Sequence, residues 1–398
     1  MKAAGSMPGA VSPAEVCRVL SVLAADSLEG RGTGTRGGAK AARFIASEFK
    51  AAGLEPAGDS GYLQLVPIVN VPPGQGRGGR AGARAVASFA DRDTFPAEQR
   101  GLAYNVVGIL RGSDPVLKDS VVLVDAHYDH LGMLSRAVDL DSLDAWNAAA
   151  APIMSERAEW MARSGITGRG ARGGAGMSEA DRAKLAEFTT RLGALRVNMD
   201  SVRRAHPVAR RDSIYNGADD DAAGTTAVIE IAKQLARGPR PKRTIIFAAT
   251  TGEEVGLIGT NWYIKHPPMP LAAMQANLEI EMIGRPDSLA GGPGRAWLTG
   301  FERSTMGESF AKAGLAVVPD KRLEQQFFQR SDNIAFARMG IPAHTLSTFN
   351  MHTDYHQLTD EVQYVDFAHM AGVINIGVKA VDLLANGPAP TWHPGGKP

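Results

Sequence analysis

The sequence predicts an α/β fold in which a mostly parallel, mixed sheet is flanked by helices. Five short apolar runs rich in β-branched residues have the composition of strands that are buried on both faces. Helix-like segments separate the later runs, and this alternation is typical of a layered α/β domain. The 398 residues are 44% hydrophobic and 21% charged, which is enough apolar material for a large core.

Each predicted element follows from local spacing. Apolar residues at helical spacing predict two N-terminal helices, over 13–27 and 39–52, joined by a glycine-rich turn. The runs predicted as strands are 105–110, 120–126, 243–250, 277–283 and 341–347. The segments predicted as helices after the second strand are 222–236, 255–265, 303–314, 332–339 and 366–385. Ligands of such sheets bind at the carboxyl ends of the strands, so side chains at these ends are the candidates for chemistry.

The predicted domain organisation is a flexible tail over 1–16 and a single domain over 17–398, with a helical insertion at 134–212. The tail is rich in small residues and shows no apolar signal-peptide core. The insertion is rich in Ala and Arg and interrupts the alternation of strands and helices. It is either a surface helical hairpin or a lid over the strand ends.

Two helices are predicted inside the insertion. The first covers 141–163, and the second opens at a capping box formed by Ser178 and Asp181 and continues to about Ala205. The glycine-rich segment 167–176 is predicted as the hinge between them.

Composition excludes several classes of function. Forty-three Lys and Arg balance 42 Asp and Glu to a formal charge of +1, so no nucleic-acid partner is expected. The only cysteine, Cys17, excludes an intramolecular disulfide and a Cys-rich zinc site, so His and carboxylates would have to hold a metal. No apolar run approaches the roughly 18 residues needed to cross a bilayer, and we expect no membrane association.

Polar residues follow the second predicted strand directly. His127 and Asp129 point the same way if the strand continues, so the carboxylate can orient the imidazole, as in the surroundings of many metal ligands. A lone H-x-D is a weak signal, and a buried histidine satisfied by hydrogen bonds is the plainer alternative.

Two further acidic segments lie at predicted strand and helix ends. The run 216–224 carries three consecutive carboxylates, which repel one another unless cations compensate, although Asp219 or Asp221 can also cap the following helix. Glu253 and Glu254 follow an apolar strand, so one can bind a metal while the other takes a proton from metal-bound water. An exposed helix N-terminus is the alternative for this pair.

The last two strands add a carboxylate pair and a histidine. Glu279 and Glu281 share one strand face, a pattern that an antiparallel edge strand with one wet face explains equally well. His356 follows the final strand, beside Tyr355. Together the strand ends carry two histidines and several carboxylates, the ligand set that Zn²⁺ prefers.

Seven stretches of the chain, in this order, resemble the dinuclear zinc exopeptidases of the M28 type, which include bacterial secreted aminopeptidases. They are LEGRGTGTRGGAKAARFIASEFKAAGLEPAG (28–58), AHYDHLG (126–132), NGADDDAAG (216–224), TTGEEVGLIGT (250–260), EIEMIGR (279–285), SDNIAFARMGIP (331–342) and DYHQLTDE (354–361). The resemblance spans most of 17–385 and omits 67–104 and the insertion. It implies the zinc exopeptidase fold and two Zn²⁺ per chain.

The resemblance also implies a ligand set. In it, His127 and Glu281 hold one zinc, Glu254 and His356 hold the other, and Asp220 bridges the two.

Further roles carry over by position. The resemblance implies that Asp129 orients His127, that Glu253 is the general base, and that Tyr355 hydrogen-bonds the tetrahedral intermediate. It also implies a cis peptide bond after the bridging aspartate, between Asp220 and Asp221.

The chain departs from the family pattern at four positions. The family often has Asp where Glu281 stands, so one extra methylene must be accommodated there. Asp221 and Ala223 replace a common Asn and Ser, and Asn333 stands where His is frequent. All five direct ligand positions are retained.

The function implied is hydrolysis of the amino-terminal peptide bond through a zinc-bridged water, on peptides with a free N-terminus. Three alternatives stay open: an acyl transferase of the glutaminyl-cyclase kind with one zinc, a carboxypeptidase using Arg285 or Arg330 to bind a carboxylate, and a catalytically inactive binding relative. The resemblance also implies a secreted or periplasmic location. The oligomeric state is left as unknown.

Overall fold

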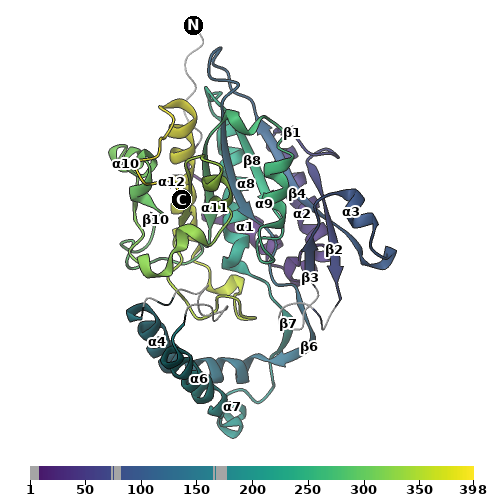
Figure 1. The fold of residues 1–398 in the computed structure, drawn as a ribbon, viewed down its shortest axis with the longest axis vertical. Helices are drawn as coiled ribbons and strands as arrows, with labels where there is room; N and C mark the ends of the chain where they lie inside the picture. Colours follow the sequence, from purple (N-terminus) through teal and green to yellow (C-terminus); the bar gives the residue numbers. More distant parts are fainter. Residues whose placement is uncertain (1–8, 73–74, 76–81, 165, 167–176) are drawn as a thin grey trace. The chain divides into compact units, whose positions relative to one another are not determined.

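The computed structural model describes residues 9–72, 75, 82–164, 166 and 177–398 (Figure 1). The chain divides into two compact units. The larger unit consists of Met1–Ser135, Ile214–Lys321 and Phe328–Pro398, and the smaller unit consists of Arg136–Ser213 and Arg322–Phe327.

The larger unit is built on one sheet, which has ten strands among the described residues, in the order β11-β10-β12-β9-β5-β8-β4-β2-β3 with β1 paired to β4. The strands are β1 (Glu55–Pro56), β2 (Leu63–Val71), β3 (Gly82–Ala85), β4 (Arg100–Leu110), β5 (Val121–His127), β8 (Thr244–Thr250), β9 (Met274–Glu281), β10 (Ala296–Leu298), β11 (Val317–Pro319) and β12 (Ala343–Ser347). The central strands β12, β9, β5 and β8 are parallel, whereas β4, β2 and β3 continue the sheet antiparallel. The predicted mixed α/β sheet is confirmed, and all five predicted strands are present.

The parallel register brings the strand ends together at one edge of the sheet. His127 at the end of β5 is paired with Thr250 at the end of β8, and Ser347 at the end of β12 is paired with Glu281 at the end of β9. Strand β9 lies between β5 and β12 and Glu279 is fully buried, so the edge-strand alternative for the glutamate pair is wrong.

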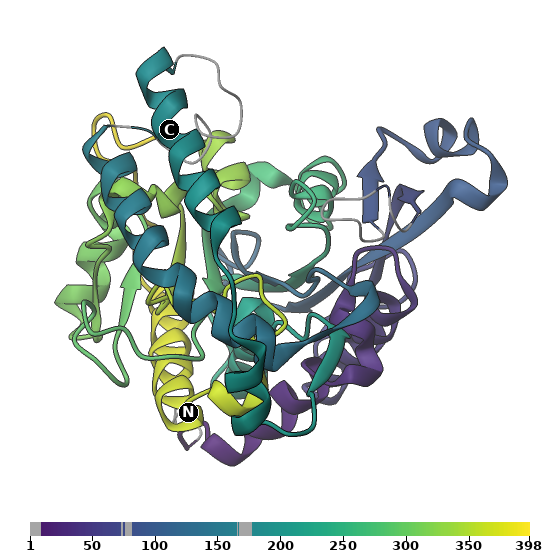
Figure 2. The ribbon, with the colours of Figure 1, turned by 90° about the horizontal axis from the view of Figure 1, so that it is seen from below.

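Helices cover both faces of this sheet (Figures 1 and 2). The helices of the larger unit are α1 (Pro13–Leu23), α2 (Arg36–Ala51), α3 (Phe89–Asp93), α8 (Gly224–Arg237), α9 (Ile258–Lys265), α10 (Thr305–Lys312), α11 (Asn333–Arg338) and α12 (Phe367–Asn386). Along β5, Val122 and Val124 pack with α1, α2, α8 and α12, and the alternate residues Val121 and Leu123 pack with α9 and α11. The alternation of side chains along each strand therefore supplies two apolar layers.

Helix α12 is long and apolar enough, by length and composition, to cross a membrane, contrary to the prediction that no such segment exists. In the structure 61% of its most apolar window is buried inside the protein. Its buried residues belong to the core shared with α1 and α8, so α12 is a core helix of the larger unit.

The N-terminal region differs from the prediction in two respects. Residues 1–8 lie outside the described part, but the Val11 N–H donates to Asn375 Oδ1 at 2.9 Å, and α1 begins at Pro13 with Ser12 as its N-cap. The predicted tail boundary at 16 is therefore too late. Strand β2 was not predicted, because Pro67 stands in its middle and proline is rare inside sheets.

The smaller unit is helical and begins and ends in a two-stranded ladder. Its elements are β6 (Met133–Asp139), α4 (Leu140–Arg163), α6 (Glu179–Ala194), α7 (Met199–Ala205) and β7 (Arg211–Ile214), with β6 paired to β7. The capping box of Ser178 and Asp181 is confirmed. The single helix predicted from there to Ala205 is wrong, because Asn198 caps a separate helix α7. The predicted hinge 167–176 lies outside the described residues, and the lid role of 134–212 stays a prediction.

Candidate metal centre

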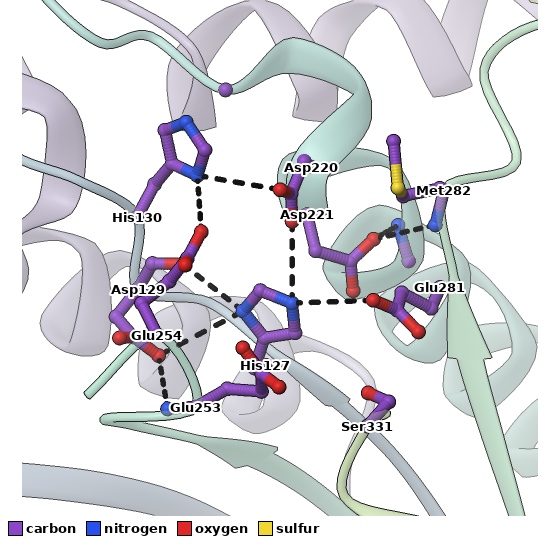
Figure 3. A network of polar contacts seen from close by, with 12 residues as sticks. His127, Asp129, His130, Asp220, Asp221, Glu253, Glu254, Glu281, Met282 and Ser331 are labelled. Carbon is purple, nitrogen blue, oxygen red and sulfur yellow. Dashed lines mark hydrogen bonds and ion pairs between the residues drawn. The ribbon is translucent and has the colours of Figure 1, made fainter. Parts of the chain in front are cut away.

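The first part of the site is the end of β5, where His127 is buried. Its Nδ1 lies 3.1 Å from the main-chain oxygen of Asp129, so Nε2 is free to face the centre of the site (Figure 3). The Asp129 carboxylate is 3.8 Å from the same Nδ1 and accepts instead from the Thr33 hydroxyl at 2.7 Å and the Glu253 N–H at 3.1 Å. The atom of Asp129 within hydrogen-bond distance of His127 is thus its main-chain oxygen, and the orienting role of Asp129 stays a prediction.

A buried arginine holds the loops around this strand end. Arg31 is 1% exposed and comes from the glycine-rich turn that the sequence predicts between α1 and α2. Its guanidinium donates to the main-chain oxygens of Leu23 at 2.7 Å, Tyr128 at 2.7 Å, Asn216 at 2.6 Å and Gly217 at 2.9 Å. Arg31 therefore ties helix α1 to both the loop after β5 and the loop before α8.

The acidic run forms a helical turn, η4 (Ala218–Ala223), at the start of α8. The peptide bond between Asp220 and Asp221 is cis, as the resemblance implies. The Asp360 carboxylate accepts the N–H groups of Asp219 at 3.1 Å and Asp220 at 3.0 Å. The backbone of this turn is thus fixed from behind, and the Asp220 carboxylate points into the site (Figure 3).

Strand β9 ends at Glu281, whose Oε1 lies 4.0 Å from His127 Nε2. The next residue, Met282, adopts a left-handed conformation with φ +50°, and its N–H donates to Asp221 Oδ1 at 2.9 Å. The same oxygen accepts the Gly224 N–H at 2.9 Å. Asp221 therefore joins the start of α8 to the end of β9, although the N-cap residue of α8 is Ala223 and not one of the three aspartates.

Glu253 and Glu254 lie in the turn between β8 and α9. The side chain of Glu253 lies beside His127 (Figure 3). Glu254 Oε1 lies 3.0 Å from both His130 Nδ1 and His356 Nε2, and the Glu254 side chain is only 5% exposed. The alternative of an exposed, glutamate-rich helix N-terminus is wrong, because these contacts bury Glu254.

His356 comes from the loop between β12 and α12 and has φ +60°. Its Nε2 lies 3.0 Å from Asp220 Oδ2 and 3.0 Å from Glu254 Oε1. The Tyr355 ring stacks on the imidazole, with centroids 3.9 Å apart and planes at 22°. Burial and the nearby Asp220 carboxylate raise the pKa of Tyr355 well above its ordinary value, so the phenol stays protonated.

The structure brings four of the five sequence-predicted ligands, together with His130, into two groups of donor atoms that share Asp220. Within each group the donor atoms lie within 4.8 Å of one another. We call them the His127 group (His127, Asp220 and Glu281) and the His130 group (His130, Asp220 and Glu254), and His356 contacts two carboxylates of the second. Asp220 Oδ1 lies 3.4 Å from His127 Nε2, whereas Oδ2 lies 3.0 Å from His356 Nε2 and 3.9 Å from His130 Nδ1.

The donor atoms fit a metal ion because they are buried and unsatisfied. Among the described residues, no hydrogen bond is made by His127 Nε2, His130 Nδ1, Asp220 Oδ2 or Glu254 Oε1. A buried polar atom without a partner costs about 1–3 kcal/mol. His and carboxylate donors converging in this way match the ligand preference of Zn²⁺.

The electrostatics of the centre also favour a cation. Burial raises the pKa of Glu253 and Asp221 well above their ordinary values. Burial, followed by repulsion from Glu279, raises the pKa of Glu281 to about 8. Carboxylates therefore outweigh the positive charge that the imidazoles can supply, and a divalent ion would relieve this repulsion.

Sequence reasoning assigned no role to three residues that shape the site: Arg31, His130 and Asp360. A second histidine three residues after His127 and an arginine in a glycine-rich turn are visible in the sequence. They become informative only when the loops are placed, because neither follows a strand or helix period.

Comparison with known proteins supports the resemblance to a peptidase family. Residues 199–393 match Peptidase family M28. A segment of 137 residues is 32% identical to leupeptin-inactivating enzyme 1 of Streptomyces exfoliatus and covers 33% of this chain and 29% of that enzyme. A segment of 251 residues is 25% identical to a probable zinc metalloprotease of Pyrenophora tritici-repentis and covers 52% of this chain and 51% of that protein. The chain thus spans about half or less of the length of these curated relatives.

The fold is shared with solved aminopeptidase structures. The aminopeptidase from Aneurinibacillus sp. strain AM-1 superposes over 96% of both chains with a TM-score of 0.55 and 13% identity. At this identity the likeness concerns the fold. With the family match, it confirms the resemblance to M28 peptidases, a hydrolase family that acts on peptides and uses zinc.

Proposed function

Residues 199–393 make this chain a member of peptidase family M28, and from that premise we propose that it is a dinuclear zinc aminopeptidase. It cleaves the peptide bond after the first residue of peptides with a free N-terminus. The observation that carries the proposal is the division of the Asp220 carboxylate, with one oxygen at 3.4 Å from His127 and the other at 3.0 Å from His356. Such an arrangement suits a carboxylate that bridges two ions.

The proposed ligands are His127 and Glu281 for one zinc, Glu254 and His356 for the other, and Asp220 for both. When bound, the ions supply Lewis-acid polarisation of the scissile carbonyl and lower the pKa of water. All the other roles fall to the side chains of this protein.

Glu253 is the proposed general base. Its side chain lies beside His127, a member of the His127 group (Figure 3). It takes the proton of the attacking water and delivers it to the leaving amine. Asp129 positions both residues, because its carboxylate accepts the Glu253 N–H at 3.1 Å and its main-chain oxygen contacts His127 Nδ1 at 3.1 Å.

Tyr355 is the proposed stabiliser of the oxyanion. Its raised pKa keeps the hydroxyl proton available for donation, and its stacking on His356 fixes the ring. The excess of carboxylates at the same place supplies charge that can hold the α-amine of the substrate.

A carboxypeptidase fits the structure less well. Arg285 already donates to Asp354 at 2.7 Å and lies 3.6 Å from Asp360, so two carboxylates occupy its charge. An inactive binding relative would be expected to lose ligands or the base, and this chain keeps them. Export to the periplasm or the medium stays a prediction.

The test combines zinc quantification with a panel of peptides that are free, N-acetylated or C-terminally amidated. We expect two zinc ions per chain, cleavage of free and amidated peptides, and none of acetylated ones. One zinc per chain with amide-forming cyclisation of N-terminal glutamine would favour the cyclase alternative, and loss of cleavage on amidation would favour a carboxypeptidase.

Glu253→Gln tests the base. We expect kcat to fall by about 10²- to 10⁴-fold with zinc content unchanged. Glu302→Gln, a change at an exposed glutamate, is the matched control and should leave both quantities at the wild-type level. Wild-type turnover by the Glu253→Gln variant would show that Glu253 is not the general base.

A further inference from the structure

His130 is a buried imidazole for which neither the resemblance nor the proposed mechanism has a use. It is 2% exposed, and among the described residues neither ring nitrogen makes a hydrogen bond. The nearest charged atoms to Nδ1 are carboxylate oxygens of Glu254 at 3.0 Å and Asp220 at 3.9 Å, so this nitrogen faces a place where negative charge gathers and a cation would be stabilised.

The orientation of the His130 ring is fixed by its surroundings. Gly217 packs against its face so closely that a Cβ there would lie 2.5 Å from the ring atoms Cγ and Cδ2. The Tyr215 ring meets it edge-on with centroids 6.4 Å apart, and the His356 ring does the same at 5.8 Å. This packing directs Nδ1 at the carboxylates of Glu254 and Asp220 (Figure 3).

The distances around Nδ1 are within a few tenths of an ångström of those between ligands of one ion. His130 Nδ1 lies 3.0 Å from Glu254 Oε1 and 3.9 Å from Asp220 Oδ2, and His356 Nε2 lies 3.0 Å from both oxygens. Four donors at about 2.0–2.2 Å from a tetrahedral zinc are about 3.3–3.6 Å apart. The observed separations lie on both sides of that value.

We propose that His130 Nδ1 is a fourth protein ligand that joins Asp220, Glu254 and His356 around one metal ion. The inference rests on the zinc site of the proposed function and adds a ligand to it. The two halves of the centre then differ. The His130 side would then offer four protein donors to its ion, whereas the His127 side would offer three.

Retention of metal should reflect this difference. The ion on the His130 side is held by one more donor, so it should be the last to leave when a chelator is added. The ion on the His127 side should leave first and return first. A role of His130 as a mere hydrogen-bond donor to Glu254 would not produce a change in the number of metal ligands.

The test compares His130→Ala, His130→Leu and His130→Asp in the full chain. Ala and Leu remove the donor, and Leu fills more of the space, so folding does not depend on one variant. Asp places an oxygen near the position of Nδ1. His369→Ala is the matched control, because His369 is equally buried and accepts the Gly294 N–H at 2.8 Å, outside the two donor groups.

The readouts are zinc per chain in a graded series of chelator concentrations and the visible absorption of the cobalt-substituted protein, which responds to the number of ligands. We expect Ala and Leu to weaken one zinc by about 100-fold, to leave the other within about threefold, and to change the cobalt spectrum. Asp should recover most of the affinity, and the His369 variant should match the wild type.

Wild-type zinc affinities and an unchanged cobalt spectrum in the folded Ala or Leu variant would overturn the proposal. Failure of the proposed function is recognised separately. If the wild-type chain holds one zinc and His130→Ala weakens it, the ligand assignment stands and the two-metal mechanism falls.

Discussion

The two donor groups of the site are supported in different ways. The His127 group takes its outer donors from strand ends, since His127 closes β5 and Glu281 closes the neighbouring parallel strand β9. The His130 group takes its outer donors from loops, and His356 adopts a left-handed backbone conformation. Sheet register positions the first pair through its own hydrogen bonds, whereas the second set depends on contacts between distant segments.

Those contacts are buried and polar, which makes them sensitive to single substitutions. Arg31 links the loops after β5 and before α8, and the Asp360 carboxylate fixes the turn that carries Asp220. We therefore expect metal binding by the loop-borne donors to weaken first when packing is disturbed. Metal binding by the strand-borne donors should weaken only when the ligands themselves are changed.

The largest expected effect comes from the residue that both groups share. Asp220→Ala removes a donor from each group, so zinc content should fall on both sides and kcat/KM should drop by at least about 10³-fold. Zinc analysis and kinetics measure this. Asp221→Asn is the control, because its carboxylate binds main-chain N–H groups and Asn keeps one acceptor. If the Asp220 variant retained both ions, the sharing would be disproved.

Arg31→Met should weaken metal binding in the two groups to different extents, because it loosens the loops that carry one of them. The substitution leaves buried main-chain oxygens without their donor and should lower the free energy of unfolding by about 3–5 kcal/mol. Urea denaturation measures the loss, and chelator titration should show the His130 side weakened more than the His127 side. Arg36→Met, a change at an exposed arginine paired with Glu29, should cost no more than about 1 kcal/mol. Equal weakening of both sides would contradict the comparison.

Gly217→Ala probes the packing against His130. A Cβ there meets the His130 ring and the main-chain oxygen of Asp220, and φ is +52°. We expect a destabilisation of about 1–3 kcal/mol together with weaker zinc binding on the His130 side. Gly61→Ala is matched in backbone conformation, with φ +64° and no described heavy atom within 4 Å of the added carbon. If the two substitutions lowered the free energy of unfolding equally, the close approach of Gly217 to the His130 ring would have no energetic role.

Glu281→Asp is expected to give the smallest effect, confined to the His127 side. In the structure Glu281 Oε1 lies 4.0 Å from His127 Nε2, and the shorter aspartate moves the carboxylate away from it. The affinity for zinc on the His127 side should fall by about tenfold. Glu254→Asp is the mirror-image control and should weaken the other ion. Tighter zinc binding by the Asp variant would show that the backbone at Met282 does not compensate for the longer glutamate.

The same division explains what could be predicted from sequence. Polar residues that directly follow buried apolar runs made His127 and Glu281 candidates at strand ends and Glu254 a candidate in the turn after β8. The structure gathers them with Asp220 and His356. Their assignment as ligands is still a proposal, and the fold itself is confirmed.

The features that were not predicted depend on contacts between segments that show no regular spacing along the chain. His130 and Arg31 matter because loops from separate parts of the sequence meet around them. Strand β2 escaped prediction because Pro67 lies within it, yet it is paired on both sides, to β3 and β4. Asn198 was an available helix-start signal that the pattern of apolar residues concealed.

The paired strands β6 and β7 have an evolutionary consequence. Because the chain enters and leaves the segment between them through neighbouring strands, a short turn can rejoin the two ends. The segment between β6 and β7 can therefore be inserted or deleted as a unit without changing the order of any strand in the main sheet.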